Sequence, residues 1–155
     1  MSGAGATWPV PPAMKRALEA AREAAATGEV PVAAAIVCDG EVVACEANAT
    51  RSPPDPTGHA EIRAIRAGAE KLGRDRLTDC DLYVTLEPCA MCAGAISHAR
   101  IARLYYAASD PKGGAVEHGA RVFEQETCLH APEVYSGMGA DEAAEILRKF
   151  FRERR

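Results

Sequence analysis

The chain has 155 residues, of which 48% are hydrophobic and 26% are charged; this balance fits one globular domain and excludes a disordered protein. The formal net charge of -4 argues against broad electrostatic binding of nucleic acid, and no apolar run approaches the ~20 residues that cross a bilayer. The first residues lack the charged start and apolar core of a secretory signal. We therefore expect a single cytoplasmic domain over residues 1–155, with no membrane segment and with a flexible stretch over residues 1–10.

In chain order, the first predicted element is a helix over residues 12–27, rich in Ala, Glu and Arg and ended at Gly28. Two β-branched runs follow within residues 30–50, joined by Asp39-Gly40, the strongest short signal for a hairpin. The pattern then predicts helices over 59–73, 89–100 and 141–155, strands over 81–87, 101–109 and 133–137, and an irregular stretch over 110–132. Strands that alternate with helices indicate parallel crossovers, so we expect an α/β fold with a mixed sheet covered on both faces.

Four of the six cysteines fall into two kinds. Cys38 and Cys45 fall within the predicted hairpin strands, and we expect them to be small core residues. Cys89 and Cys92 form a Pro-Cys-x-x-Cys sequence where a strand gives way to a helix. In a cytosolic chain of this size a disulfide framework is not expected, so this pair indicates metal or redox chemistry.

A second polar sequence opens the preceding predicted helix, where His59 and Glu61 stand two residues apart. Such residues point ~200° apart in mid-helix, but at a helix start their side chains reach past the end. The preceding residues favour a helix start, with Thr57 as a plausible cap, and Pro88 favours the first turn of the helix that carries the cysteines. Two helix N-termini are therefore expected to face one point.

One His and two Cys are ligands that suit zinc, and three protein ligands leave an open position, as in a catalytic site. Zinc lowers the pKa of a bound water to about 7, and a neighbouring carboxylate can carry its proton. Taken singly, His59 could be a helix cap, and Glu61 could interact favourably with the positive end of the helix dipole. Together, His-x-Glu and Pro-Cys-x-x-Cys are the signature of zinc-dependent nucleobase deaminases.

The segments PTGHAEIRAIR and LYVTLEPCAMCAGAISHARIARLYY resemble the cytidine deaminase superfamily, and more narrowly the bacterial tRNA adenosine deaminase family. The resemblance extends to DPKGGAVEHGARVF and to the final FFRERR, so it covers nearly the whole chain. It implies a three-layer α/β/α, cytidine deaminase-like fold with a mixed five-stranded sheet, a homodimer, and one Zn²⁺ per subunit. The implied reaction is hydrolytic deamination of the wobble adenosine of an arginine tRNA to inosine.

The family's functional residues can be carried over position by position. The resemblance implies that His59, Cys89 and Cys92 bind zinc and that Glu61 transfers protons. It implies that Asn48 holds the base and that Asp110 lies near the sugar of the nucleotide. The residues implied to contact the anticodon loop are Phe150, Phe151, Arg152 and Arg154. From the residues alone, the asparagine and aspartate also fit ordinary turns. The C-terminal residues equally fit an amphipathic helix with a solvated basic end, although aromatics beside arginines suit RNA stacking.

Two positions depart from the family pattern, and two rival functions stay open. Gly58 stands where the family usually has alanine, and Ala33 where glycine is common; both are expected near the pocket. One rival is a deaminase of a free base, guanine or cytosine, which would not need the basic C-terminus. The other is a non-catalytic, zinc-stabilised RNA-binding domain, which would need a fourth protein ligand. The spare candidates are Cys128 and His98, and His98 is expected to face ~240° away from Cys92.

Overall fold

The structure, a computed structural model, describes residues 9–154. The flexibility expected for residues 1–10 therefore lies mostly outside the described residues. The helices are α1 (Pro12–Ala26), α2 (Ala60–Leu72), α3 (Ala90–Ala99) and α4 (Ala140–Glu153), and the strands are β1 (Ala33–Cys38), β2 (Glu41–Ala47), β3 (Cys80–Leu86), β4 (Arg103–Ala108) and β5 (Glu133–Ser136). One turn of 3-10 helix, Val122–Glu124, interrupts the long connection between β4 and β5. The predicted order of elements is confirmed.

The strands form one mixed sheet in the order β2-β1-β3-β4-β5. β1 is antiparallel to both β2 and β3, whereas β3, β4 and β5 are parallel. Asp39 and Gly40 close the hairpin between β1 and β2 with φ of 52° and 76°, the left-handed values that a type I′ turn requires at both central positions. The carboxyl ends of the parallel strands β3 and β4 lie at one edge of the sheet, where ligand sites form in open α/β sheets.

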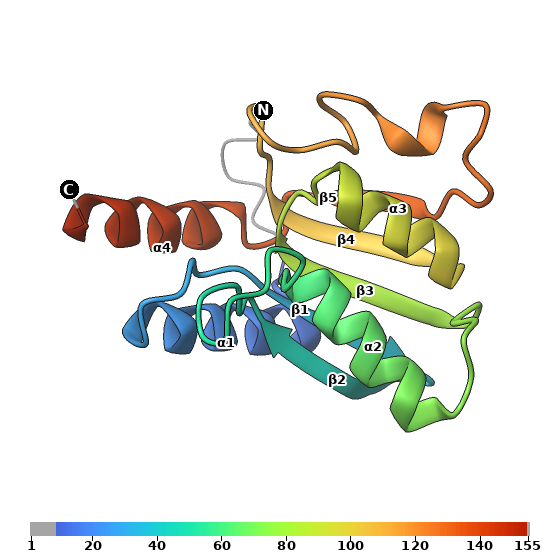
Figure 1. Ribbon diagram of the computed structural model, residues 1–155, viewed down its shortest axis with the longest axis horizontal. Coiled ribbons are helices and arrows are strands. Elements are labelled where there is room, and N and C mark those ends of the chain that lie inside the picture. The colour runs from blue at the N-terminus through green and yellow to red at the C-terminus, as the bar shows by residue number, and fades with distance from the viewer. Residues whose placement is uncertain (1–8, 155) are drawn as a thin grey trace.

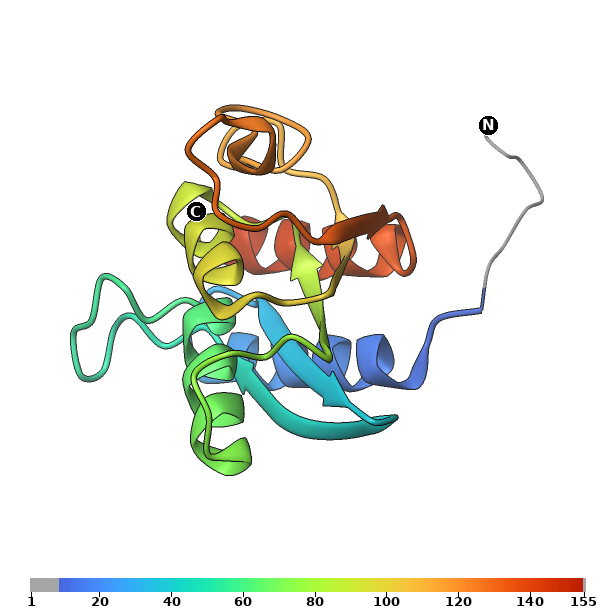
Figure 2. The same ribbon diagram turned by 90° about the vertical axis from the view of Figure 1, so that its right-hand side faces the viewer.

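Helices cover the sheet on both faces, which confirms the predicted three-layer fold (Figures 1 and 2). The side chains of each strand alternate between the two layers. Ile36, Leu82 and Leu104 pack toward α2 and α3, whereas Ala33 and Ala107 pack toward α1 and α4. No helix in the described part of the chain is long and apolar enough to cross a bilayer.

Two local predictions at the helix starts are wrong. His59 occupies the N-cap position of α2 without a capping hydrogen bond from its side chain, and the Thr57 hydroxyl donates to Asp55 Oδ1 at 2.7 Å. α3 begins at Ala90 with Cys89 as its N-cap, so Pro88 precedes the cap and is not part of the first turn. In both cases the helix starts one or two residues later than the turn signals indicate. The N-cap position is then occupied by a candidate metal ligand.

Candidate active site

The two helices α2 and α3 start next to each other, and each begins with a candidate ligand. His59 and Cys89 are the N-cap residues, with extended backbone angles (φ -73°, ψ 151° and φ -74°, ψ 177°). Neither side chain caps its own helix. Both are therefore free to project beyond the helix ends, and Cys92 joins them from the first turn of α3.

The three ligand atoms form a compact triangle. His59 Nδ1 lies 3.6 Å from Cys89 Sγ and 3.5 Å from Cys92 Sγ, and all three atoms lie within 4.8 Å of one another. A tetrahedral zinc ion with Zn–S of about 2.3 Å and Zn–N of about 2.0 Å separates nitrogen from sulfur by about 3.5 Å. The cluster thus fits zinc. Within residues 9–154 no fourth His, Cys, Asp or Glu belongs to this cluster, so three protein ligands would leave one coordination position for water or substrate.

The charge state of the two thiols also suits a metal. Hydrogen bonding from Cys92, assisted by the His59 ring, lowers the pKa of Cys89 to about 5, so this sulfur is a thiolate at neutral pH. The same contact with Cys89, together with burial, raises the pKa of Cys92. The N-terminus of α3 further favours negative charge at both sulfurs. Because a metal ion binds cysteine as the thiolate, binding displaces any proton that the pair still carries.

Glu61 lies in the first turn of α2 and is only 4% exposed. Burial raises its pKa to about 7, and the side chain contacts the Cys92 thiol. A carboxyl group that titrates near neutral pH can both accept and donate a proton under physiological conditions. The structure thus brings Glu61 to the same site as the three candidate ligands, as the sequence predicts.

The two spare metal ligands considered from the sequence lie elsewhere. His98 is exposed on α3, as its position around the helix predicts. The Cys128 thiol donates to the carbonyl of His130 at 3.2 Å and lies 3.5 Å from Ser97 Oγ. Neither side chain joins the cluster of His59, Cys89 and Cys92.

Asn48 and Asp110 follow the ends of β2 and β4. Asn48 is half-buried, and its backbone N–H donates to the carbonyl of Val32 at 2.9 Å. Asp110 Oδ1 accepts hydrogen bonds from the backbone N–H groups of Lys112 (3.2 Å) and Gly113 (3.0 Å), so the side chain holds a turn. A role for either residue toward substrate stays a prediction.

The four candidate RNA contacts of α4 differ in accessibility. Phe150 is only 2% exposed, and the guanidinium carbon of Arg154 lies 3.9 Å from the centre of its ring. Phe151 is 45% exposed, and the Arg152 side chain is exposed near Glu145. The structure therefore places the Phe150 ring in the core beneath α4, where it is covered from RNA, and leaves Phe151 and Arg152 open to a partner.

The two positions that depart from the family pattern lie in different places. A Cβ atom at Gly58 would lie 2.3 Å from the carbonyl oxygen of Ala49, so the backbone comes too close here for any side chain. Gly58 is thus needed for a close contact in the loop that leads into His59. Ala33 is fully buried and packs toward α1 and α4, on the sheet face opposite the metal ligands, so the expectation that it lies near the pocket is wrong.

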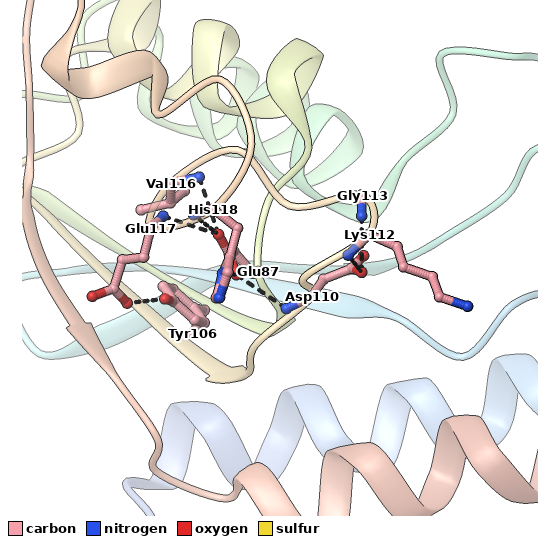
Figure 3. Close-up of polar contacts among 8 residues, drawn as sticks. All are labelled: Glu87, Tyr106, Asp110, Lys112, Gly113, Val116, Glu117 and His118. Carbon is pink, nitrogen blue, oxygen red and sulfur yellow. Dashed lines mark hydrogen bonds and ion pairs between the residues drawn. The ribbon is translucent and has the colours of Figure 1, made fainter.

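Sequence reasoning missed Glu87, which follows β3 and lies two residues before Cys89. This residue is 2% exposed, and its carboxylate collects five hydrogen bonds from the segment 110–118 (Figure 3). Burial raises its pKa, but the hydrogen bonds from Asp110, His118 and their neighbours outweigh burial and hold the pKa below its usual value. The available signal was a charged residue that directly continues a buried strand.

A second group of donor atoms lies at the opposite end of β3. Asp79 contacts both Cys38 Sγ (3.5 Å) and Cys80 Sγ (3.6 Å), and Cys38 pairs with Cys80 across β1 and β3. The guanidinium of Arg74 donates to Asp79 at 2.5 Å and lies 3.7 Å from Cys38 Sγ. Burial raises the pKa of Cys80 to about 12, so this thiol stays protonated. An arginine already supplies the cation here, and we assign no metal to this group.

Comparison with known proteins agrees with this geometry. The chain matches the family model of the cytidine and deoxycytidylate deaminase zinc-binding region over residues 11–108. Together with the three-layer fold and the His/Cys/Cys cluster, this match defines a zinc-binding deaminase.

More specific relatives narrow the class. The tRNA-specific adenosine deaminase of Agrobacterium fabrum is 61% identical over 142 residues, which cover 92% of this chain and 93% of that protein. A solved structure from a study of A-to-I editing by tRNA:A34 deaminases at the wobble position of transfer RNA is 59% identical, with a TM-score of 0.86, over 87% of this chain and 98% of that chain. The chain therefore belongs to the tRNA-specific adenosine deaminase family.

The fold is also shared with a deaminase of a free base. The structure of guanine deaminase from Bacillus subtilis is 44% identical and has a TM-score of 0.61, but the match covers 63% of this chain and 62% of that chain. The shared part of the fold alone does not distinguish a nucleic acid substrate from a free base.

Proposed function

We propose that the chain, taken as one deaminase domain over residues 1–155, is a zinc-dependent hydrolase that converts the wobble adenosine of a tRNA to inosine. The observation that carries the proposal is the cluster of His59, Cys89 and Cys92 beside the buried Glu61. It occurs in a chain that is 61% identical over 92% of its length to a tRNA-specific adenosine deaminase.

Glu61 is the proton carrier in this reaction. When bound by the cluster, zinc supplies a Lewis acid that activates water for attack on C6 of adenine. The Glu61 carboxylate takes the proton of the attacking water and delivers it to N1 of the ring. It then helps to protonate the leaving ammonia. Burial, which raises the pKa of the Glu61 carboxyl group, favours its taking up the proton that it passes on.

The start of α3 supports the reaction electrostatically. The first backbone N–H groups of a helix have no partner within the helix, and they carry partial positive charge. Those that follow Cys89 point toward the cluster because Cys89 is the N-cap. They favour the thiolate form of the ligands and the negative charge that develops during attack.

The substrate and the assembly follow from the family. We propose an anticodon loop, that of an arginine tRNA, as the substrate, a homodimer as the assembly and the cytoplasm as the location. Asn48 would hold the base and Asp110 the sugar of the splayed nucleotide. Phe151 and Arg152 are exposed at the end of α4 and are suited to stacking and phosphate contact. Arg154 is proposed here with them, and Phe150 supports them from beneath.

A deaminase of free guanine is the second candidate, because guanine deaminase from Bacillus subtilis shares part of the fold at 44% identity. The adenosine relatives match a far larger share of the chain. A non-catalytic zinc domain is disfavoured because no fourth ligand joins the cluster within residues 9–154 and because a carboxyl group is buried beside it.

The test is inosine formation in a transcribed arginine-tRNA anticodon stem-loop, with free guanine, cytosine and cytidine in parallel. We expect inosine at the wobble position with wild-type protein and a loss of at least about 10³-fold with Glu61→Gln at unchanged zinc content. Activity on a free base alone would keep the chemistry and reject the tRNA substrate. Absence of activity on every substrate, with zinc bound, would favour the non-catalytic domain.

A further inference from the structure

Glu87 directly follows β3, and its buried carboxylate has no hydrogen-bond partner within that strand. Its residue is 2% exposed, and an isolated buried charge is strongly unfavourable unless hydrogen bonds satisfy it. Every hydrogen bond found for this side chain comes from the segment 110–118, which lies more than twenty residues further along the chain (Figure 3). This carboxylate therefore joins β3 to a segment that has neither helix nor strand.

The two oxygens serve different parts of the segment. Oε1 accepts from the backbone N–H of Asp110 at 3.0 Å and contacts His118 Nδ1 at 2.7 Å. Oε2 accepts from three consecutive backbone N–H groups, those of Val116 (3.1 Å), Glu117 (2.9 Å) and His118 (3.1 Å). Successive N–H groups that converge on one anion form a concave backbone site, here filled by the protein's own carboxylate. One side chain thus holds both ends of the segment.

The segment is also joined to the metal ligands. The backbone N–H of Ala115 donates to the carbonyl of Pro88 at 2.8 Å, and Pro88 directly precedes Cys89. A Cβ at Gly114 would lie 2.5 Å from Glu87 Cδ and 2.6 Å from the Asp110 carbonyl oxygen, so the segment wraps tightly around the carboxylate. Tyr106 of β4 further holds it by donating to the Glu117 carboxylate.

We propose that Glu87 is a positioning residue that fixes the segment 110–118, and Asp110 with it, against the metal cluster and thereby sets the site's affinity for the substrate nucleotide. The inference rests on the proposed function, because it assigns the segment to the substrate of that reaction. Glu87 acts through Asp110 and the backbone and touches neither substrate nor metal.

Glu87→Gln tests the proposal with little change of shape. An amide has a single acceptor oxygen, so in either orientation one of the two attachments, at Asp110 or at residues 116–118, loses its acceptor. The control is Thr85→Val near the end of β3, which removes a buried acceptor for the Ala33 N–H (3.2 Å) and leaves the segment untouched. Both variants are compared with wild type as the full-length, zinc-loaded protein.

Two readouts are measured, hydrogen exchange of the amides in 110–118 and steady-state deamination of the anticodon stem-loop, with zinc content as a check. For Glu87→Gln we expect exchange at least about tenfold faster, one zinc per chain, and KM raised about tenfold with kcat changed less than about threefold. Thr85→Val should keep both exchange in this segment and KM at wild-type values. If Glu87→Gln fails to fold, His118→Ala, which removes one attachment, should show the same changes at about threefold.

Unchanged exchange in 110–118 would overturn the proposal, and so would faster exchange with an unchanged KM. An equal rise of KM in Thr85→Val would also overturn it, because the effect would then be a general loss of stability. A wild-type protein that is inactive on the stem-loop would instead reject the proposed function, and with it the assignment of the segment to this substrate. The exchange data would still report whether Glu87 holds the segment.

Discussion

Gly58→Ala places a single methyl group against the backbone of the loop before His59. The added Cβ would lie 2.3 Å from the Ala49 carbonyl oxygen, 3.1 Å from its carbon and 3.2 Å from the Asp55 carbonyl oxygen. All three are backbone atoms, and two hydrogen bonds hold them: Ala49 N–H to the Gly58 carbonyl (2.8 Å) and Gly58 N–H to the Asp55 carbonyl (3.0 Å). The loop must open by about 1 Å to restore normal contact between carbon and oxygen.

Overpacking of this kind costs about 1–3 kcal/mol, which lowers Tm by about 3–10 °C for a chain of this size. The assay is thermal unfolding of the zinc-loaded protein followed by circular dichroism. Gly94→Ala is the matched control, since its Cβ meets no atom within 4 Å and alanine favours the helix by up to about 1 kcal/mol. A Tm for Gly58→Ala equal to wild type would refute the close contact as the reason for glycine at this position.

Three further outcomes are expected. Cys92→Ser should reduce the zinc content, measured by atomic emission, from about one ion per chain to well below it, because a thiolate ligand is lost. Burial raises the pKa of Glu29, but hydrogen bonds from Thr50 and Arg51 outweigh burial, so the pKa of Glu29 lies below its usual value. A lowered pKa stabilises the fold above the ordinary value of about 4.3 and loses this effect as pH falls through the folded pKa. Glu29→Gln should therefore have a lower urea midpoint than wild type at pH 7, and the difference should disappear under acid conditions; a constant difference would contradict this. Phe151→Ala should raise KM for the stem-loop about tenfold at unchanged Tm, because its exposed ring is proposed to contact RNA. Phe150→Ala should lower the free energy of unfolding by about 3–5 kcal/mol, because its ring is buried. Equal effects of the two variants in both assays would contradict these different roles.

The elements of the fold could be predicted from local signals because those signals have direct steric causes. Asp39-Gly40 reads as a hairpin because both positions need left-handed backbone angles, and these angles are found. The candidate metal ligands could be grouped because each lies at a helix start, where side chains project past the end. The exact helix starts could not be predicted, since the positions of His59 and Cys89 as N-cap residues depend on how the preceding loops pack.

Features that depend on neighbouring elements were harder to predict. Adjacent residues on a helix point ~100° apart, so Phe150 and Phe151 differ in exposure although their rings touch, and which of them is buried depends on where α4 packs. The signal was present, because Ala143, Leu147 and Phe150 follow the spacing of one apolar helix face: Ala143 and Leu147 pack against the core clusters, and Phe150 is buried. For Glu87 the sequence shows only a charged residue after a buried strand, and its partners become neighbours only when the segment 110–118 folds back over the end of β3.

The placement of metal ligands at two helix starts has a consequence for the unfolded chain. His59 and Cys89 are separated by 30 residues, so a shared ion closes a loop of that length. Treated like a covalent crosslink, such a loop removes about 3–4 kcal/mol of chain entropy from the unfolded ensemble. The ion would thus be a removable crosslink between α2 and α3 in addition to its role in the reaction. Chelation should then lower the free energy of unfolding of the whole domain, since β3, which lies between the two helix starts, pairs with both β1 and β4 in the sheet.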